Sequence, residues 1–223
     1  MHDSSAMPIE RLTPERRREL TRTALIEAAA EVFTRRGFHA ASLEEIAEAA
    51  GFTRGAIYSN FGNKEDILIA VLDLYTDRQL TAFADAFARA SQGTREERTA
   101  AAGEVWSHIQ QEQRLPTLSL EMRLYALRNP AFRRHLAMAE RRHQQQIAAF
   151  IEQIATTEGR LLQFEARDLA EMLRAFSDGL SQLAAVDDER AAYYETLAVR
   201  FFTLMDQAIP EDSNAKKKPP KKR

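Results

Sequence analysis

The sequence contains no cysteine among its 223 residues. Disulfides, thiol nucleophiles and zinc sites with cysteine ligands are therefore excluded. Glycine is also scarce, with 8 residues, which argues against a fold built from many strands and tight turns. No apolar run approaches the roughly 20 residues of a membrane-spanning helix, and the N-terminal segment MHDSSAMPIER lacks the apolar core of a signal peptide. We expect a cytoplasmic protein with no membrane partner.

The sequence also lacks the signatures of an enzyme. No phosphate loop, nucleophile elbow or dinucleotide fingerprint occurs. The 5 histidines have no metal-binding spacing, because none lies four residues from another as in a helical ligand pair. They are His2, His39, His108, His135 and His143. We therefore expect no bound metal, no cofactor and no catalytic activity.

The residue types that are abundant favour helix. Ala, Glu, Leu, Arg and Gln are frequent, and each has a high helix propensity, so we predict an all-α fold. The net charge is −2, but six of the 31 basic residues lie in the last eight, KKKPPKKR, which leaves 25 basic against 33 acidic residues elsewhere. An acidic body argues against general nucleic-acid coating. Any binding of nucleic acid must therefore come from a local patch.

Capping signals place the helices. Thr13 precedes Pro14, a typical N-cap followed by proline at the first helical position, and Gly37 is the expected stop of that helix. Ser42 and Glu45 form a capping box for a second, short helix. The first four predicted helices cover 14–36, 43–50, 54–61 and 63–89. Further helices are expected through residue 106, over the segment SLEMRLYALR, and over 130–157, 165–186 and 189–208.

Residues 42–61, SLEEIAEAAGFTRGAIYSNF, have the spacing of a helix-turn-helix. In that motif the first helix braces the second, whose N-terminal residues enter the major groove of DNA. The segment 53–64 carries no acid, against the trend of the chain. Its small and polar side chains suit close approach to bases and donation to phosphates: Arg54, Gly55, Ala56, Tyr58, Ser59, Asn60 and Lys64. The same pattern could also form an ordinary helical hairpin inside an all-α core.

The flanking sequence decides between these two interpretations. The stretch from Leu25 to Leu72, LIEAAAEVFTRRGFHAASLEEIAEAAGFTRGAIYSNFGNKEDILIAVL, closely resembles the DNA-binding domain of TetR-family transcriptional regulators. The resemblance implies a homodimer that binds a palindromic double-stranded DNA operator. It most often implies a repressor that an unknown small-molecule effector releases. An activator, or a ligand-independent DNA-binding or interaction module of the same fold, is the alternative.

The resemblance also implies the contacts with DNA. Base-edge contacts are expected at Arg54, Gly55 and Ala56. Phosphate contacts are expected at Ser42, Thr53, Tyr58, Asn60 and Lys64. The Arg54 guanidinium could donate two hydrogen bonds to guanine, or it could bind a phosphate.

These predictions divide the chain into four parts. They are a flexible arm over 1–12, a three-helix DNA-binding domain over 13–62, a helical ligand-binding and dimerisation domain over 63–209, and a basic disordered tail over 210–223. The segment 63–89 is the connecting helix, which we expect a ligand to shift so that the separation of the two recognition helices changes. The tail either adds non-specific attraction to DNA or only keeps the protein in solution.

Two apolar series with coiled-coil spacing lie near the end of the chain. The first consists of Leu169, Leu173, Phe176, Leu180 and Leu183, and the second of Tyr194, Leu197, Phe201, Leu204 and Ala208. Two such helix pairs can form a four-helix bundle between subunits. We therefore predict the dimer interface there, although both series could instead pack inside one chain.

The ligand pocket is expected among the helices of the C-terminal part. Its candidate residues are Phe83, Phe87, Trp106, Met122, Tyr125 and Phe176, with Glu121 and His108 as possible polar contacts. Each of these side chains could equally belong to the core, because an aromatic residue at helical spacing is usually buried packing.

Overall fold

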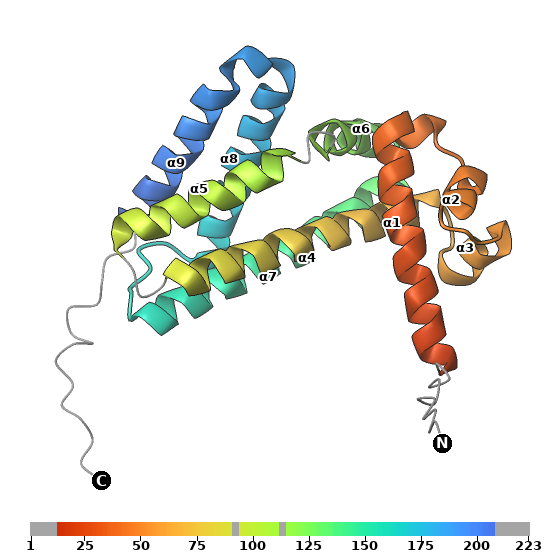
Figure 1. The fold of residues 1–223 in the computed structure, drawn as a ribbon, viewed down its shortest axis with the longest axis horizontal. Coiled ribbons are helices and arrows are strands. Elements are labelled where there is room, and N and C mark those ends of the chain that lie inside the picture. The colour runs from red at the N-terminus through yellow and green to blue at the C-terminus, as the bar shows by residue number, and fades with distance from the viewer. Residues whose placement is uncertain (1–12, 91–93, 112–114, 208–223) are drawn as a thin grey trace, which may run out of the picture. The chain divides into compact units, whose positions relative to one another are not determined.

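The computed structural model describes residues 13–90, 94–111 and 115–207, and every regular element in these ranges is a helix. Figure 1 follows the helices along the chain by colour. They are α1 (Pro14–Ala40), α2 (Leu43–Ala49), α3 (Arg54–Asn60), α4 (Lys64–Ala90), α5 (Arg95–Gln111), α6 (Leu115–Arg128), α7 (Pro130–Glu158), α8 (Ala166–Val186), the short 3-10 helix η1 (Asp188–Arg190) and α9 (Ala191–Gln207). The predicted all-α class is confirmed. Within the described ranges, none of these helices combines the length and the apolarity needed to cross a membrane.

The chain divides into two compact units, the first ending at Val71 and the second beginning at Leu72. The first unit contains α1, α2, α3 and the beginning of α4, and the second contains the rest of α4 and all later helices. The predicted arm over 1–12 and the basic tail lie outside the described residues.

Local capping signals shape the first unit. The Thr13 side chain accepts a hydrogen bond from the backbone N–H of Arg16 at 3.2 Å, as the sequence predicts for an N-cap. Ser42 and Glu45 make both bonds of the predicted capping box at the start of α2. These short-range bonds fix where α1 and α2 begin.

Gly37 interrupts the first helix, as the sequence predicts. Its φ of 77° and ψ of 162° lie in a region that is essentially restricted to glycine. The helix that begins at Pro14 is broken there, and a second short helical stretch follows to Ala40, so that α1 (Pro14–Ala40) consists of two helical stretches joined by a kink at Gly37. The kink brings the Phe38 ring within 5.6 Å of the Phe33 ring, measured between centroids, and both side chains are buried.

The second unit is built from helix pairs. The chain contacts join α5 with α9, α7 with α8, α6 with α7 and α8, and α8 with α9. Figure 1 shows α8 and α9 as neighbouring helices at the end of the described chain. A core cluster around Trp106 ties α5, α8 and α9 together through Leu180, Tyr194 and Ala198.

Candidate DNA-binding surface and internal cavity

The helix-turn-helix presents the N-terminal end of α3 to solvent. Thr53 occupies the N-cap position, but its side chain makes no capping hydrogen bond. Thr53, Arg54 and Gly55 are exposed, and Ala56 is half-buried. A Cβ atom added to Gly55 would meet only the Thr53 hydroxyl, at 3.6 Å, which is ordinary contact. Packing among the described residues therefore does not require glycine at position 55, and the small residue leaves room for a partner outside the chain.

Arg54 is already engaged on this surface. Its guanidinium donates to the Tyr58 hydroxyl from Nε at 3.2 Å and from Nη2 at 2.8 Å. It also forms an ion pair with Glu44 of α2. The hydrogen bond to Tyr58 and the charge of Glu44 raise the pKa of Arg54. The structure thus joins two predicted DNA contacts to each other and adds Glu44, an acid that the sequence analysis did not single out.

The opposite end of α3 is held by α1. Arg18 donates to the backbone carbonyl of Ser59 at 3.1 Å, and Arg22 donates to that of Asn60 at 2.9 Å. The Arg22 guanidinium also lies over the Phe61 ring, 4.2 Å from its centroid. The last carbonyls of a helix have no partner within the helix, and cations are favourable at that end. The sequence analysis missed both arginines; their i, i+4 spacing on the helix before the motif was the available signal.

Three of the predicted phosphate contacts also have partners inside the chain. The Ser42 hydroxyl accepts from the backbone N–H of Glu45 at 3.1 Å. The Asn60 amide donates to the carbonyl of Ala56 at 2.8 Å. The Lys64 ammonium donates to the carbonyl of Ala41 at 2.8 Å and to that of residue 39 at 3.3 Å.

Lys64 is therefore a structural cation as well as a predicted phosphate contact. Its ammonium lies 4.6 Å from the centroid of the Phe38 ring, and burial lowers its pKa. An ammonium has three N–H donors, so the two carbonyls leave one for a phosphate. Thr53, Arg54 and Tyr58, by contrast, are exposed.

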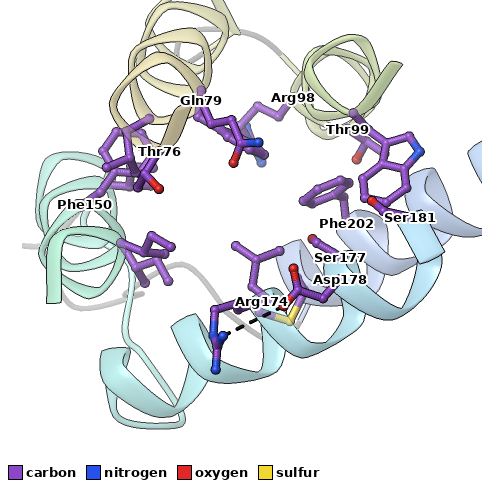
Figure 2. Close-up of a pocket in the computed structure, with 18 of the residues that line it drawn as sticks. Thr76, Gln79, Arg98, Thr99, Phe150, Arg174, Ser177, Asp178, Ser181 and Phe202 are labelled. Atoms are coloured by element: carbon purple, nitrogen blue, oxygen red, sulfur yellow. Dashed lines mark ion pairs between the residues drawn. The ribbon is translucent and has the colours of Figure 1, made fainter. Parts of the chain in front are cut away.

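The second unit contains a partly open cavity of about 320 Å³. Five helices, α4, α5, α7, α8 and α9, supply its lining. Figure 2 shows Phe150 on one side of the cavity and Phe202 on the other, with Gln79 above and Ser177 below. A volume of this size lies at the lower end of the range for small-molecule sites.

The structure places two of the predicted pocket residues in the lining, Phe83 and Trp106. The other described candidates lie outside it: Met122 is buried in the core, Tyr125 packs against Phe132 with centroids 5.1 Å apart, and Glu121 is half-buried on α6. Phe176 stacks on Phe201 with centroids 3.8 Å apart. The side chains of Phe87 and His108 lie outside the described residues.

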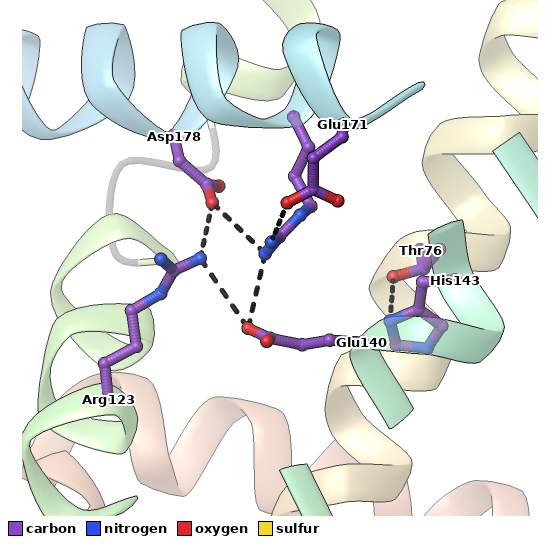
Figure 3. A network of polar contacts seen from close by, with 7 residues as sticks. Thr76, Arg123, Glu140, His143, Glu171 and Asp178 are labelled. Atoms are coloured by element: carbon purple, nitrogen blue, oxygen red, sulfur yellow. Dashed lines mark hydrogen bonds and ion pairs between the residues drawn. The ribbon is translucent and has the colours of Figure 1, made fainter. Parts of the chain in front are cut away.

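Charged side chains at the cavity belong to polar networks. Asp178 pairs with Arg123 of α6 and with Arg174 of α8. Arg174 also donates to Glu171 at 2.8 Å and to Glu140 at 3.4 Å. Figure 3 shows these groups gathered between α6, α7 and α8. Burial works against the charge of Arg174, but the hydrogen bond to Glu171 and the surrounding carboxylates raise its pKa overall.

A second polar contact links α4 to α7. His143 Nε2 lies 2.7 Å from a carboxylate oxygen of Asp73, and its Nδ1 lies 3.3 Å from the Thr76 hydroxyl. Burial raises the pKa of Asp73, but the hydrogen bond and charge of His143 outweigh it and lower the pKa. Within the described residues, no three histidine or acidic side chains gather closely enough to hold a metal ion.

Most residues of the predicted dimer interface pack within the single chain. Leu169, Leu180 and Tyr194 are buried in it, and Leu173 lines the cavity. The half-buried side chains of the two series are Leu173, Phe176, Leu197 and Phe201. The physical reason is that this side of α8 faces α7 and α9, whose contacts already cover it.

Other apolar side chains of α8 and α9 face outward. Leu183 and Leu204, from the predicted series, are 56% and 63% exposed. Met172, Val186 and Tyr193 are exposed as well, although the sequence analysis did not select them. Ala208 lies outside the described residues.

Comparison with known families matches both units. The model for bacterial regulatory proteins of the tetR family matches residues 25–71, and the model for the C-terminal part of BetI-type transcriptional repressors matches residues 94–201. The transcriptional regulator TtgR of Pseudomonas putida is 49% identical over 63 residues, which are 28% of this chain and 30% of that protein. The transcriptional activator FasR of Mycolicibacterium smegmatis is 42% identical over 60 residues, 27% of each protein. The match thus spans less than a third of these relatives.

Solved structures share the fold over a longer range. A TetR-family regulator from Rhodococcus sp. superposes with a TM-score of 0.68 at 20% identity, over 83% of this chain and 98% of that one. FadR of Bacillus subtilis, solved with stearoyl-CoA, superposes with a TM-score of 0.55 at 19% identity. The superposition covers 79% of this chain and 97% of FadR. A regulator from Saccharomonospora viridis, solved with choline, superposes with a TM-score of 0.54 at 23% identity. The superposition covers 87% of this chain and 100% of that regulator.

Proposed function

The chain belongs to the TetR family of DNA-binding transcriptional regulators. On this basis we propose that it is a homodimer, and that a small molecule bound in the cavity controls its affinity for the operator. The two units divide these tasks. The first binds DNA, and the second binds the effector and the other subunit.

The exposed end of α3 supports the DNA-binding part of the proposal. Arg54 reads a base edge, because its guanidinium can donate twice to guanine. Gly55 and Ala56 allow the helix to come close to the bases. Thr53 and Tyr58 bind phosphates, which position the helix without reading sequence, and Ser42, Asn60 and Lys64 add weaker contacts through their remaining hydrogen-bonding capacity.

The cavity supports control by a ligand. The neighbours from B. subtilis and S. viridis were solved with stearoyl-CoA and with choline, so proteins of this fold hold ligands of very different chemistry. The fold by itself therefore does not determine the effector of this chain. The residues that line its own cavity must do so.

The helix α4 offers a route from the cavity to the DNA-binding unit. It runs without interruption from Lys64 to Ala90. Thr76, Gln79 and Phe83 on this helix line the cavity, while its beginning belongs to the first unit. A ligand that binds the DNA-incompetent conformation more tightly will shift the population away from operator binding. The two recognition helices must match half-sites about 34–36 Å apart or a multiple of that distance.

We propose a repressor, which the ligand releases from an operator that overlaps a promoter. The named activator among the relatives, FasR, favours activation as the second candidate. The two differ in whether the operator overlaps a promoter or lies upstream of it.

The observation that carries the proposal is the combination of an exposed, acid-free α3 with a ligand-sized cavity whose wall includes α4. Selection of bound sequences from a random duplex pool with the full-length protein should enrich an inverted repeat. Arg54→Ala should then reduce the binding free energy for that repeat by roughly 1–3 kcal/mol and weaken the base preference at one base pair. An equal loss of affinity for the repeat and for random DNA would show that Arg54 does not read a base. Enriched sequences without inverted symmetry would contradict an operator bound by a dimer.

A further inference from the structure

The charged side chains that line the cavity all have partners within the protein. Arg160 pairs with Glu158 at 3.2 Å, and both side chains are nearly buried. Arg174 and Asp178 belong to the network of Figure 3. Arg98 is engaged as well. The charges of Arg160 and Arg174 are thus already balanced by carboxylates, so an anionic ligand would have to displace one of these pairs. The donors left to a ligand on these side chains are the buried Nε atoms of Arg98 and Arg174, which have no hydrogen-bond partner in the described residues.

The remaining wall is apolar and aromatic. Phe83, Trp106, Phe150 and Phe202 come from four different helices, and the Phe83 and Phe202 rings lie 5.9 Å apart between centroids. Leucine and isoleucine side chains complete the apolar part of the lining: Leu80, Ile147, Ile151, Ile154 and Leu173. Such a wall favours a flat, polarizable body that can stack or pack edge to face on the rings.

The uncharged polar groups of the lining provide hydrogen bonds. Gln79 of α4 and Ser177 of α8 reach toward the cavity from opposite sides in Figure 2. The Thr99 hydroxyl is buried and has no hydrogen-bond partner in the described part of the chain. A hydroxyl or carbonyl group on a ligand can bond to such groups without bringing a charge into the cavity.

From these observations, and resting on the proposed role of the cavity as the effector site, we propose that the effector is an uncharged aromatic compound with a hydroxyl or carbonyl group, and that the cavity discriminates against carboxylates and quaternary ammonium ions. The physical basis is desolvation. Moving a charge out of water is costly unless a free opposite charge receives it, whereas an aromatic body gains from burial and loses little.

A series of probes with one ring system tests this selectivity. 2-Naphthol is uncharged at neutral pH, 2-naphthoate is an anion and 2-naphthyltrimethylammonium is a cation. Calorimetric titration of the full-length protein should give a dissociation constant for 2-naphthol at least about tenfold below that of either ion. 2-Naphthol should also raise the melting temperature the most, because binding to the native state stabilises it.

A substitution in the network provides a gain-of-binding test. Asp178→Asn keeps the shape of the side chain but removes a carboxylate from beside Arg123 and Arg174. Arg123 and Arg174 keep Glu140 and Glu171 as partners, but the cluster loses one negative charge beside the cavity. The affinity for 2-naphthoate should therefore increase by about tenfold, with little change for 2-naphthol. Asp168→Asn is the matched control, because Asp168 lies on the same helix but is exposed and pairs with Arg167 at 3.6 Å outside the cavity lining.

The outcomes separate this inference from the function on which it rests. Tighter binding of either ion than of 2-naphthol to the unmodified protein overturns the inference and leaves an effector cavity in place. An unchanged affinity of a folded Asp178→Asn protein for 2-naphthoate shows that pairing of the charges is not what excludes anions, and also overturns it. Binding of none of the three probes also overturns the inference, because the cavity then does not accept an aromatic body, whereas the proposed function is decided separately by the operator selection.

Discussion

At the scale of single residues, one guanidinium has competing partners. Arg54 is shared between Tyr58 and Glu44 in the absence of DNA. The side chains of Arg54 and Glu44 are 58% and 55% exposed, and an exposed ion pair contributes only about 0–1 kcal/mol. A DNA phosphate or base can therefore take Arg54 from Glu44 at little cost.

Glu44 should accordingly weaken DNA binding. Glu44→Gln removes a negative charge beside the proposed DNA surface and frees Arg54, so we expect a severalfold higher affinity for operator and random DNA alike, most visibly at low salt. Fluorescence anisotropy over a salt series measures the effect. Glu48→Gln, on the exposed side of the same helix, is the control. A loss of affinity in Glu44→Gln would instead show that Glu44 orients Arg54 for binding.

Arg22 should act by positioning α3. Arg22→Gln removes the hydrogen bond to the Asn60 carbonyl and the contact with the Phe61 ring, so we expect weaker operator binding and a smaller preference for operator over random DNA. The salt dependence should hardly change, because a positioning residue releases no counterion from DNA. Arg35→Gln removes the same charge from the same helix as a control.

The salt slope distinguishes this role from direct contact. If Arg22 binds a phosphate, Arg22→Gln should reduce the slope of log affinity against log salt concentration by about one unit. It should also lower the affinity for all DNA sequences equally. That result would replace the positioning role with a phosphate contact.

At the scale of elements, the kink in α1 depends on one backbone conformation. Gly37 has φ 77° and ψ 162°, and holding another residue there costs about 1–3 kcal/mol. Gly37→Ala should lower the stability of the first unit by that amount in urea unfolding, because the Phe33–Phe38 contact requires the kink.

Gly55→Ala is the matched substitution at a helical glycine. A Cβ fits there without a close contact, so α3 should gain roughly 0.5–1 kcal/mol from the higher helix propensity of alanine. DNA affinity should nevertheless fall if the helix approaches the bases closely at this position. Equal destabilisation by both substitutions would contradict the special role of the Gly37 backbone.

At the scale of the whole molecule, the outward apolar residues of α8 and α9 are the proposed contact between subunits. Leu183, Val186 and Leu204 are large apolar side chains that are exposed in the single chain, and contact with a second copy would remove their apolar area from water. A symmetric contact would use each residue twice.

Leu183→Glu should therefore produce monomers that remain helical. The buried, unpaired charge would occur twice per dimer and cost several kcal/mol. Sedimentation velocity gives the mass, and far-UV circular dichroism gives the helicity. Met138→Glu, an equally exposed position on α7, should stay dimeric. A Leu183→Glu protein that remains a dimer would place the interface elsewhere.

Phe201→Glu should behave differently from Leu183→Glu. Phe201 is half-buried and stacks on Phe176 within the chain, so a charge there should lower the melting temperature of the second unit before it affects assembly. The two variants together separate the interior of the chain from its proposed contact surface.

The sequence by itself determined the features that depend on neighbours along the chain. The capping box of Ser42 and Glu45, the N-cap at Thr13 and the helix-turn-helix spacing all involve residues a few positions apart, and the structure has the expected bonds. The family was also readable, because its motif is one contiguous stretch. Such local signals need no knowledge of what packs against them.

Only the tertiary structure decided which neighbours each helix face meets. α8 carries apolar residues on two sides, and periodicity alone could not tell that Leu180 is buried in the chain while Leu183 is exposed. Likewise, Arg18 and Arg22 reach α3 from about forty positions away in the sequence, and the cavity gathers residues from five helices. The physical reason is that hydrophobic burial is non-directional. A sequence pattern therefore predicts that a helix face is buried, but it does not predict which helix packs against that face.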